Sequence, residues 1–251
     1  MPAIQDAYGY RLIAQGKPLE RWEMGPLEPG SGEVVVEVAG CGVCHTDVSF
    51  AYQGVPTRHE LPLILGHEIS GRVAAAGEGA EEWQDCTVVV PAVIPCGECT
   101  ACQAGRPTVC ARQFMPGNDG HGGFATHVKV PARGLCPVPE EQPAGTTLAP
   151  LSVVADAVTT PFEAIRRAGL GADDVAVFVG AGGIGGFGVQ IAAAVGSAVA
   201  AIDPDSGRRE MAAAHGAGLT LDPSELGFKE LKGAIRAFAK ESGRMGVGLS
   251  L

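Results

Sequence analysis

The pattern of hydrophobic and polar residues changes near residue 150 and divides the chain into two halves. In the first half, short runs rich in valine alternate with glycine and proline, which is typical of a domain built from many short β-strands. The clearest runs cover residues 34–38, 88–90 and 127–130. The pattern therefore predicts a β-rich domain over residues 1–155.

The second half reads as short apolar strands that alternate with helix-sized segments. We predict strands over residues 174–179, 198–202 and 219–221, and helices over residues 184–195, 206–215 and 228–241. Alternation of this kind indicates parallel β-α-β units. An α/β domain over residues 156–251 is therefore expected to follow the β-rich one.

Composition and charge narrow the class of partner. The chain has 251 residues and a net charge of −10, so neither nucleic acid nor an anionic membrane surface is an expected partner. No stretch approaches 18 consecutive apolar residues, and the N-terminus lacks the pattern of a signal peptide. We expect a cytoplasmic protein, in which the eight cysteines are metal ligands or buried thiols rather than disulfides.

Four of the cysteines lie close together in a loop rich in glycine and proline. Cys96, Cys99, Cys102 and Cys110 follow the spacing C-x2-C-x2-C-x7-C. Four thiolates at such spacing can surround one zinc ion, and a closed tetrahedral site of this kind stabilises structure without performing chemistry. A zinc ribbon that binds nucleic acid is disfavoured, because the chain is acidic and has no basic stripe around this loop. The remaining cysteines, Cys41, Cys86 and Cys136, are interpreted as small buried apolar residues.

A glycine-rich motif opens the first predicted helix of the second half. It follows the pattern G-x-G-x-x-G and comprises Gly180, Gly182, Gly183, Ile184 and Gly185 around Ala181. Asp203 lies 23 residues after Gly180, directly behind the next predicted strand, which is the context of a dinucleotide-binding site. A carboxylate there binds ribose hydroxyls and repels a 2′-phosphate, so NAD is expected rather than NADP. Arg208 and Arg209 are the residues that could relax this preference, and a glycine turn without a ligand is the alternative.

Two further short motifs contain potential metal ligands, namely C-H-T-D at residues 44–47 and G-H-E at residues 66–68. Each motif is weak by itself, because a single histidine is more often a surface or core residue. Together with the four-cysteine loop, however, they resemble the zinc-dependent medium-chain alcohol dehydrogenases. The resemblance implies a GroES-like β-barrel catalytic domain over residues 1–155 and a partial NAD-binding Rossmann domain over residues 156–251.

The resemblance also implies roles for individual residues. Cys44, His67 and Asp156 would hold a catalytic zinc, with Asp156 in the place of a cysteine in other branches, and Glu68 would be a neighbour or alternate ligand. Asp47 would orient His67, and Thr46 would accept the substrate proton. Ser49 stands where many relatives have a histidine that ends the proton relay, so the exit of the proton would run through Ser49, the cofactor ribose or water. His45 would contact the pyrophosphate and Arg208 the adenosine ribose. The alternative for Asp156 is a simple N-cap of the following helix.

One branch of that superfamily resembles the chain over several stretches, namely residues 38–47, 65–73, 90–99, 115–119 and 152–161. These are the 6-hydroxycyclohex-1-ene-1-carbonyl-CoA dehydrogenases of anaerobic aromatic compound degradation. The resemblance implies an alicyclic hydroxyacyl-CoA that is oxidised to the ketone with NAD. Arg58, His59, Arg112 and Lys129 are candidate cations for the CoA phosphates. Another alcohol or a polyol is the alternative substrate.

The family resemblance ends near residue 242. Members of the family are longer, and the strand–helix pattern here covers only the first mononucleotide half of a doubly wound sheet. We therefore expect a C-terminally truncated chain that binds two zinc ions and ADP-like ligands but catalyses poorly or not at all. A non-catalytic zinc- and nucleotide-binding remnant is the alternative from another class. The resemblance implies a homo-oligomer for full-length relatives, which pair through the far edge of the sheet. This chain lacks that edge, so the same pairing is not expected of it.

Overall fold

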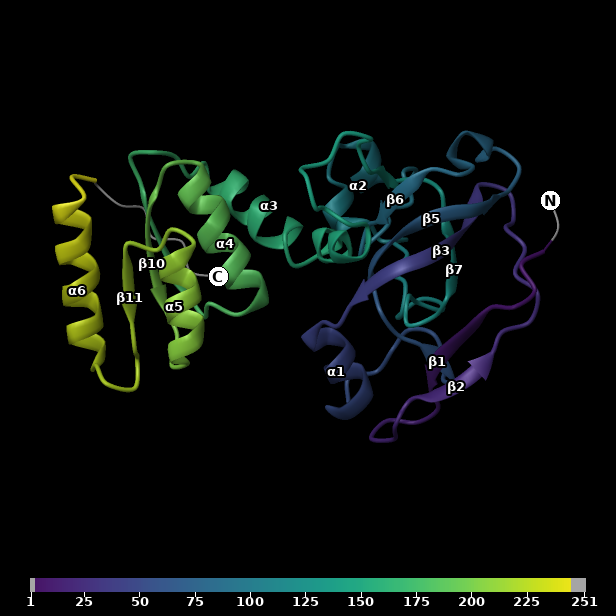
Figure 1. Cartoon of the computed structure of the whole chain (residues 1–251), viewed down its shortest axis with the longest axis horizontal. Helices are drawn as coiled ribbons and strands as arrows, with labels where there is room; N and C mark the ends of the chain where they lie inside the picture. Colours follow the sequence, from purple (N-terminus) through teal and green to yellow (C-terminus); the bar gives the residue numbers. More distant parts are fainter. Residues whose placement is uncertain (1–2, 245–251) are drawn as a thin grey trace. The chain divides into compact units, whose positions relative to one another are not determined.

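The computed structural model of the chain describes residues 3–244. It divides into two units, Met1–Asp156 and Ala157–Leu251, and each is described by itself. Unit 1 holds the β-rich part, and unit 2 holds the alternating strands and helices (Figure 1). Within residues 3–244, no helix combines the length and the apolar character needed to cross a membrane.

Unit 1 is built on a five-stranded antiparallel sheet in the order β7-β3-β5-β6-β8. Its strands are β3 (Glu33–Gly42), β5 (Glu68–Ala76), β6 (Thr87–Val90), β7 (His127–Pro131) and β8 (Cys136–Pro137). A second sheet, β2-β1-β4, consists of β1 (Tyr8–Leu12), β2 (Glu20–Glu23) and β4 (Leu63–Ile64). The three valine-rich runs predicted as strands lie in β3, β6 and β7, which confirms a β-rich first half.

The core of unit 1 comes from side chains that alternate along these strands. Val34 and Val36 of β3 and Ile69 and Val73 of β5 are fully buried in one cluster with residues of β6 and β7. The pairing of β3 with β5 sets Gly42 opposite Glu68. Residues 44 and 67 therefore emerge at the same end of two neighbouring, rigidly packed strands.

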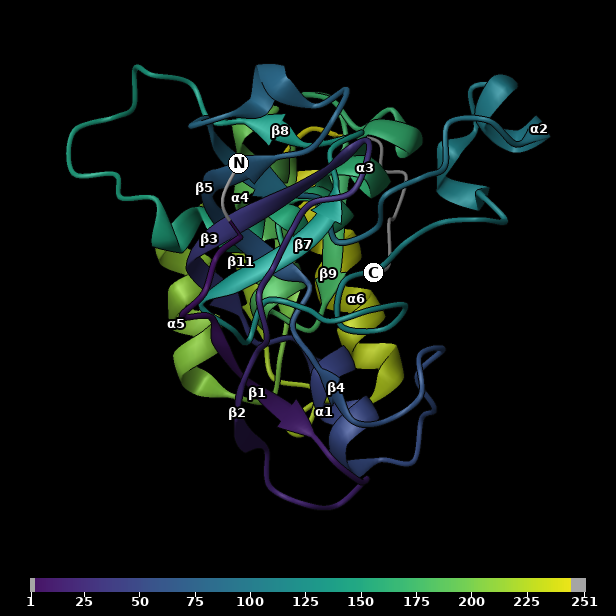
Figure 2. The same ribbon diagram turned by 90° about the vertical axis from the view of Figure 1, so that its right-hand side faces the viewer.

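Short helices occupy the connections of unit 1. The helix α1 (His45–Tyr52) follows β3, and the 3-10 helix η3 (Ala149–Ala155) ends the unit. Two further 3-10 helices are η1 (Glu81–Trp83) and η2 (Pro107–Val109). The four-cysteine loop contains α2 (Thr100–Gln103) and η2, and it projects away from the sheets (Figure 2).

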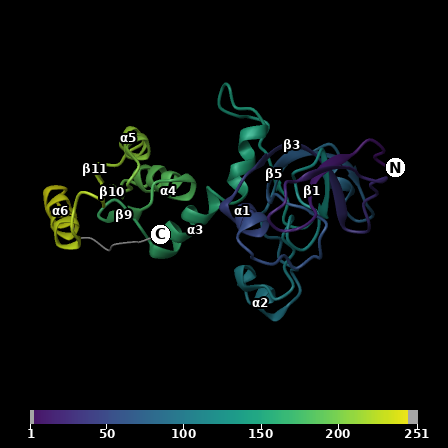
Figure 3. The ribbon, with the colours of Figure 1, turned by 90° about the horizontal axis from the view of Figure 1, so that it is seen from below.

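Unit 2 contains a parallel three-stranded sheet in the order β11-β10-β9. After α3 (Thr159–Ala168), its elements are β9 (Val175–Val179), α4 (Gly183–Ala194), β10 (Ala198–Ile202), α5 (Ser206–Ala214), β11 (Leu219–Leu221) and α6 (Phe228–Glu241). Figure 3 shows α4 and α5 next to each other and α6 beside β11. The predicted bounds of β10, β11 and α6 coincide with the observed ones, and the others differ by single residues. The α/β part of the predicted fold class is therefore confirmed.

One prediction about burial is wrong. Cys136 is exposed rather than buried, because β8 is a two-residue strand at the edge of its sheet. Cys41 and Cys86 are partly buried and pack against the core of unit 1. Burial raises the pKa of the Cys41 thiol to about 12, so this sulfur is an unreactive thiol at neutral pH.

The stretch that carries His67 is held in place by the chain segment that follows residue 120. Backbone N–H groups of Gly122, Gly123 and Phe124 donate to the carbonyl oxygens of residues 64, 66 and 65. At the start of that segment, His121 Nδ1 lies 3.3 Å from the backbone nitrogen of Ile64 and accepts its N–H. The His121 ring also packs against Trp22 and His59. Burial, together with the charges of His59 and Arg11, holds the pKa of His121 below its ordinary value.

We predict that the folded state loses stability as the pH falls below about 6.5, where an unfolded histidine takes up its proton. Folded His121 binds that proton less readily, and protonation removes the acceptor of the Ile64 N–H. In His121→Gln this contribution to the pH dependence disappears, so the variant and the wild type differ less in free energy of unfolding at pH 5 than at pH 8. Urea unfolding followed by circular dichroism measures the difference in free energy of unfolding between variant and wild type at each pH. Equal differences at pH 5 and pH 8 contradict the prediction.

Candidate metal and nucleotide sites

Asp47 joins the two segments that carry Cys44 and His67. Cys44 occupies the N-cap of α1, and its backbone N–H donates to Asp47 Oδ2 at 2.9 Å. Asp47 Oδ1 accepts the N–H of Gly66 at 3.0 Å, and the Asp47 side chain is buried. One carboxylate in the first turn of α1 therefore fixes the backbone beside both potential ligands.

Asp156 completes a group of three potential metal ligands with Cys44 and His67. One ligand atom from each of the three residues lies within 4.8 Å of the others. Asp156 Oδ2 is 3.4 Å from His67 Nε2 and 3.8 Å from Cys44 Sγ. Asp156 is the C-cap residue of η3, whereas α3 begins at Thr159 with Val158 at its N-cap. The alternative of an N-cap role for Asp156 is therefore wrong.

The electrostatics of the group suit a cation. His67 is 1% exposed, and its Nδ1 lies 3.5 Å from Asp47 Oδ1. Burial opposes a charge on the His67 ring, but Asp156 and Asp47 outweigh it and raise the pKa to about 10. Among the described residues, neither ring nitrogen finds a well-aligned hydrogen-bond partner. A buried imidazole whose nitrogens have no well-aligned hydrogen bond, a thiol and a carboxylate form a donor set that zinc prefers.

The other residues expected around this group lie at different distances from it. Thr46 Oγ1 is 3.7 Å from Cys44 Sγ, at the edge of the group. Glu68 is buried on β5 next to His67, and it is not a member of the group of three. Ser49 Oγ lies 3.0 Å from the carbonyl oxygen of His45 and 2.8 Å from Gln53 Oε1. His45 is exposed, and its Nε2 is 3.3 Å from Gln53 Nε2.

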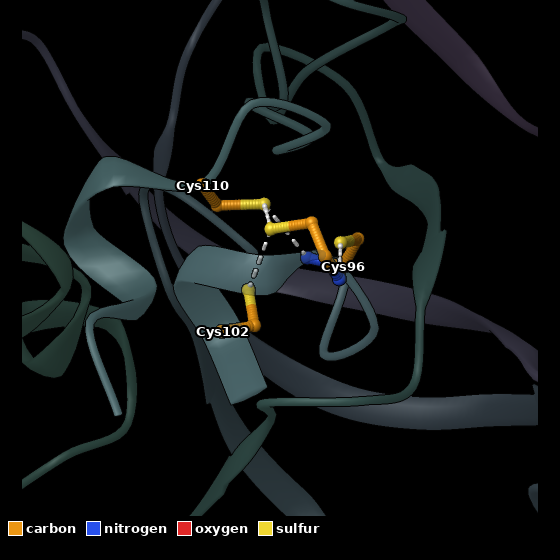
Figure 4. A group of neighbouring side chains, drawn as sticks. Cys96, Cys102 and Cys110 are labelled. Carbon is orange, nitrogen blue, oxygen red and sulfur yellow. Dashed lines mark hydrogen bonds between the residues drawn. The ribbon is translucent and has the colours of Figure 1, made fainter. Parts of the chain in front are cut away.

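The four cysteines of the loop with α2 converge on one centre (Figure 4). Cys99 Sγ is 3.5 Å from Cys102 Sγ and 3.7 Å from Cys110 Sγ. The backbone N–H groups of Cys96 and Arg112 both donate to Cys110 Sγ at 3.3 Å. Hydrogen bonds from the backbone of Cys102 lower the pKa of Cys99 to about 6. N–H donors aimed at sulfur favour thiolates, which are the form that binds zinc.

The glycine motif in unit 2 forms the turn between β9 and α4. Gly182 is the N-cap of α4, so the first N–H groups of the helix face this turn. A Cβ at Gly185 would overlap the carbonyl oxygen of Gly180, so only glycine lets the helix pack so closely on the turn. Beside the turn lies a pocket of about 480 Å³, whose lining includes Ala181, Gly183 and Arg208. Free N–H groups at a helix N-terminus next to such a pocket are suited to binding phosphate.

Asp203 lies directly behind β10 and is 1% exposed. Its Oδ2 accepts the N–H of Ala181 at 2.8 Å, and its Oδ1 accepts the N–H of Asp205 at 2.9 Å. Burial opposes the charge of Asp203, but these two donors hold its pKa below the ordinary value. The carboxylate therefore stays ionised at the edge of the turn.

The two arginines of α5 have different surroundings. Arg208 lines the pocket and is exposed, with Nη1 3.8 Å from Asp203 Oδ2. Arg209 instead forms an ion pair with Asp222 at 2.8 Å and donates to the carbonyl oxygen of Asp203 at 2.7 Å. Of these two, only Arg208 is among the residues that line the pocket.

Sequence reasoning missed six residues that line this pocket, and Asp205 is one of them. Asp205 lines it and caps α5, since its Oδ1 accepts the N–H of Arg208 at 2.8 Å. An aspartate directly before a predicted helix is a known capping signal and would have identified it.

The chain is similar in sequence and in structure to known alcohol dehydrogenases. The family described as "Alcohol dehydrogenase GroES-like domain" matches residues 30–140. An alcohol dehydrogenase from Moraxella sp. (strain TAE123) is 34% identical over 226 residues, which are 87% of this chain and 66% of the relative. This chain spans about two thirds or less of the length of the first curated relatives it matches.

Solved structures show the same similarity. Galactitol-1-phosphate dehydrogenase from Escherichia coli matches with a TM-score of 0.85 and 25% identity, over 97% of this chain and 68% of that chain. Acetophenone reductase from Geotrichum candidum, in complex with NAD, matches with a TM-score of 0.79 and 30% identity, over 88% of this chain and 64% of that chain.

We predict that the purified chain binds about two zinc ions, one in each group of ligands. His67→Ala removes a ligand from the group with Cys44 and lowers the zinc content to about one per chain. Cys102→Ser opens the four-cysteine centre and lowers the content by about the same amount. Elemental analysis of dialysed protein measures both values, and a wild type with at most one bound zinc contradicts the prediction.

We also predict that two neighbouring substitutions have different effects: Arg208→Ala weakens ADP binding, whereas Arg209→Ala lowers the folding stability. Arg208→Ala weakens the binding of ADP about tenfold, since a charge-assisted contact is lost, and leaves the melting temperature unchanged. Arg209→Ala leaves Asp222 without its partner and costs about 1–3 kcal/mol of folding stability. Calorimetric titration with ADP and thermal unfolding measure the two effects. The same loss of ADP affinity in both variants would show that the pocket does not distinguish the two arginines.

Proposed function

The chain belongs to the zinc-dependent medium-chain alcohol dehydrogenase superfamily, and from this premise we propose that the protein oxidises a secondary alcohol to a ketone with NAD as the hydride acceptor. The observation that supports this most is the group of Cys44, His67 and Asp156 within 4.8 Å, inside the unit that matches the GroES-like domain. These residues come from three separate segments of the chain, and their convergence is not needed for the core.

Cys44, His67 and Asp156 are proposed to hold a catalytic zinc, with Glu68 as a buried neighbour. Three protein ligands leave one position open for a substrate oxygen. When bound there, zinc acts as a Lewis acid that lowers the pKa of the substrate hydroxyl. Asp47 holds the backbone of both ligand segments and faces His67 Nδ1, which orients the ring.

Thr46 is proposed to move the proton. Its Oγ1 lies beside Cys44 Sγ, so it is the hydroxyl that accepts the substrate proton in this proposal. From Thr46 the proton passes to water or along α1, where Ser49 is hydrogen-bonded to Gln53. The Ser49 hydroxyl does not ionise near neutral pH, so it can pass a proton along hydrogen bonds but does not act as the final proton acceptor.

The turn at Gly180 to Gly185 is proposed to bind the pyrophosphate of NAD, and Asp203 and Arg208 the adenosine ribose. Asp203 is ionised and lies at the edge of the turn, where a 2′-phosphate would meet its negative charge. This charge supports NAD rather than NADP. The four-cysteine centre is proposed to hold a second, structural zinc, since four thiolates leave no open position.

For the substrate we propose an alicyclic hydroxyacyl-CoA, which rests on the sequence stretches that resemble that branch. Three candidate cations for its phosphates are already paired, since Arg58 lies 3.2 Å from Asp119, Arg112 3.4 Å from Glu98, and Lys129 3.7 Å from Glu33. His59 packs on His121. The cationic side chains of these pairs are exposed, so the pairs are weak. The alternative substrate is a smaller alcohol or a polyol, in line with relatives named for galactonate and galactitol phosphate.

A substrate panel tests the proposal. Since the chain carries only part of the nucleotide-binding domain of its relatives, we expect the zinc-loaded chain to form NADH slowly from a cyclic secondary alcohol, and less product with NADP. His67→Gln is expected to lower kcat/KM by more than about a hundredfold, since even partners behind metal ligands are worth 10–100-fold. His215→Gln is the matched control, because His215 is exposed at the end of α5. Absorbance at 340 nm measures the rates.

The panel contains a hydroxyacyl-CoA, its free acid, cyclohexanol and a polyol. A rate that depends on the CoA moiety supports the alicyclic hydroxyacyl-CoA. Equal rates with the free acid or higher rates with a polyol support the alternative substrates. A chain with two bound zinc ions and no turnover of any alcohol would refute the proposed activity and support a non-catalytic zinc- and nucleotide-binding protein.

A further inference from the structure

The segment that ends at Asp156 is tied to β5 by one buried hydroxyl. Ser70 lies on β5 and is fully buried. Its Oγ lies 2.7 Å from the carbonyl oxygen of Leu148 and 3.3 Å from that of Ala149. These two residues form the start of η3, the 3-10 helix whose C-cap is Asp156. Ser70 therefore holds the beginning of the segment that delivers the third potential ligand.

Strand β3 contacts the same segment through Gly40, which pairs with Ser70 of β5. Its pairing with β5 is irregular between Val38 and Gly40. A Cβ at Gly40 would overlap the carbonyl oxygen of Ala149 and lie 2.8 Å from its Cα. The backbone of residue 149 therefore packs directly against the backbone of β3. The start of η3 therefore packs against the Gly40–Ser70 pair of β3 and β5.

The hydrogen bond of Ser70 adds to the packing of η3 against β3 and β5, and it matters because η3 holds its own shape weakly. A 3-10 helix has poorer hydrogen-bond geometry than an α-helix, and η3 has no side-chain cap at its N-terminus. Without the hydroxyl, the carbonyl of Leu148 keeps the N–H of Leu151 as a donor, but the start of η3 loses its hydrogen bond to β5 and is free to shift. Such a shift would be passed along η3 to Asp156.

We propose that Ser70 is a positioning residue that sets the place of Asp156 relative to Cys44 and His67. Strand β5 then positions two of the three ligands. His67 directly precedes its first residue, and Ser70, its third residue, holds the segment that ends at Asp156. This inference rests on the metal-binding role proposed for Cys44, His67 and Asp156. It concerns metal affinity and not the reaction.

Cobalt(II) tests the proposal, because its visible spectrum distinguishes a site with one thiolate from a site with four. In Ser70→Ala, we expect the cobalt affinity of the site with Cys44 to fall about tenfold, by analogy with other residues behind metal ligands. The four-cysteine site in the same molecule should keep its affinity. Ser70→Thr retains the hydroxyl and should bind cobalt within about threefold of the wild type.

Ser197→Ala is the matched control. Ser197 Oγ donates to the carbonyl oxygen of Gly171 at 2.7 Å, and Ser197 is also buried. The substitution removes the same kind of hydrogen bond, but it lies in unit 2. Both cobalt affinities should therefore remain unchanged.

Gly40→Ala approaches the same segment from β3 and keeps the test decisive if Ser70→Ala does not fold. Its methyl group would displace residue 149, so we expect a similar loss of cobalt affinity at the site with Cys44 only. Unchanged affinity in a folded Ser70→Ala, or in Gly40→Ala, would overturn the proposal. Turnover is scored separately, so a wild type that loads both sites but oxidises no alcohol refutes the enzymatic function and leaves the result for Ser70 standing.

Discussion

The register between β3 and β5 is the constraint on which the candidate metal site depends. Gly42 pairs with Glu68 across two antiparallel strands whose inward side chains are fully buried. A slip of one residue would turn the valines of β3 away from the core, which makes the register costly to change. Cys44 and His67 lie just beyond this pair, so the hydrophobic core fixes where they meet.

Polar groups then refine the geometry that the core provides. Asp47 accepts N–H groups from Cys44 and Gly66, which ties the start of α1 to the residue before His67. Ser70 holds the start of η3, the segment that ends at Asp156. Both side chains are buried and act on the backbone, so they restrict the ligands without occupying a coordination position. The hydrophobic core and the buried polar groups together explain how ligands from three distant segments can be held in one place.

Features of the fold and the site can be predicted from the sequence when they arise from residues close together in the chain, and not when they arise from residues far apart in it. The elements of unit 2 follow from local patterns, because each β-α-β unit has its own apolar strand and helix period. The four cysteines are close in sequence, and their spacing alone indicates their convergence. The role of Asp156 came only from family resemblance, and the contact of Ser70 with Leu148 joins residues 78 positions apart through a backbone carbonyl. No local pattern marks such a contact.

The distribution of the candidate groups over the two units has a consequence for how the proposed reaction can be analysed. Cys44, His67, Asp156 and the four cysteines all lie in unit 1, whereas the glycine turn, Asp203 and Arg208 lie in unit 2. The proposed metal binding therefore depends on the strand register and buried hydrogen bonds of one unit. The proposed nucleotide binding depends on the turn and the helix N-terminus of the other. Because hydride transfer needs both ligands at once, loss of turnover alone cannot identify the unit at fault, and binding of metal and nucleotide has to be measured separately.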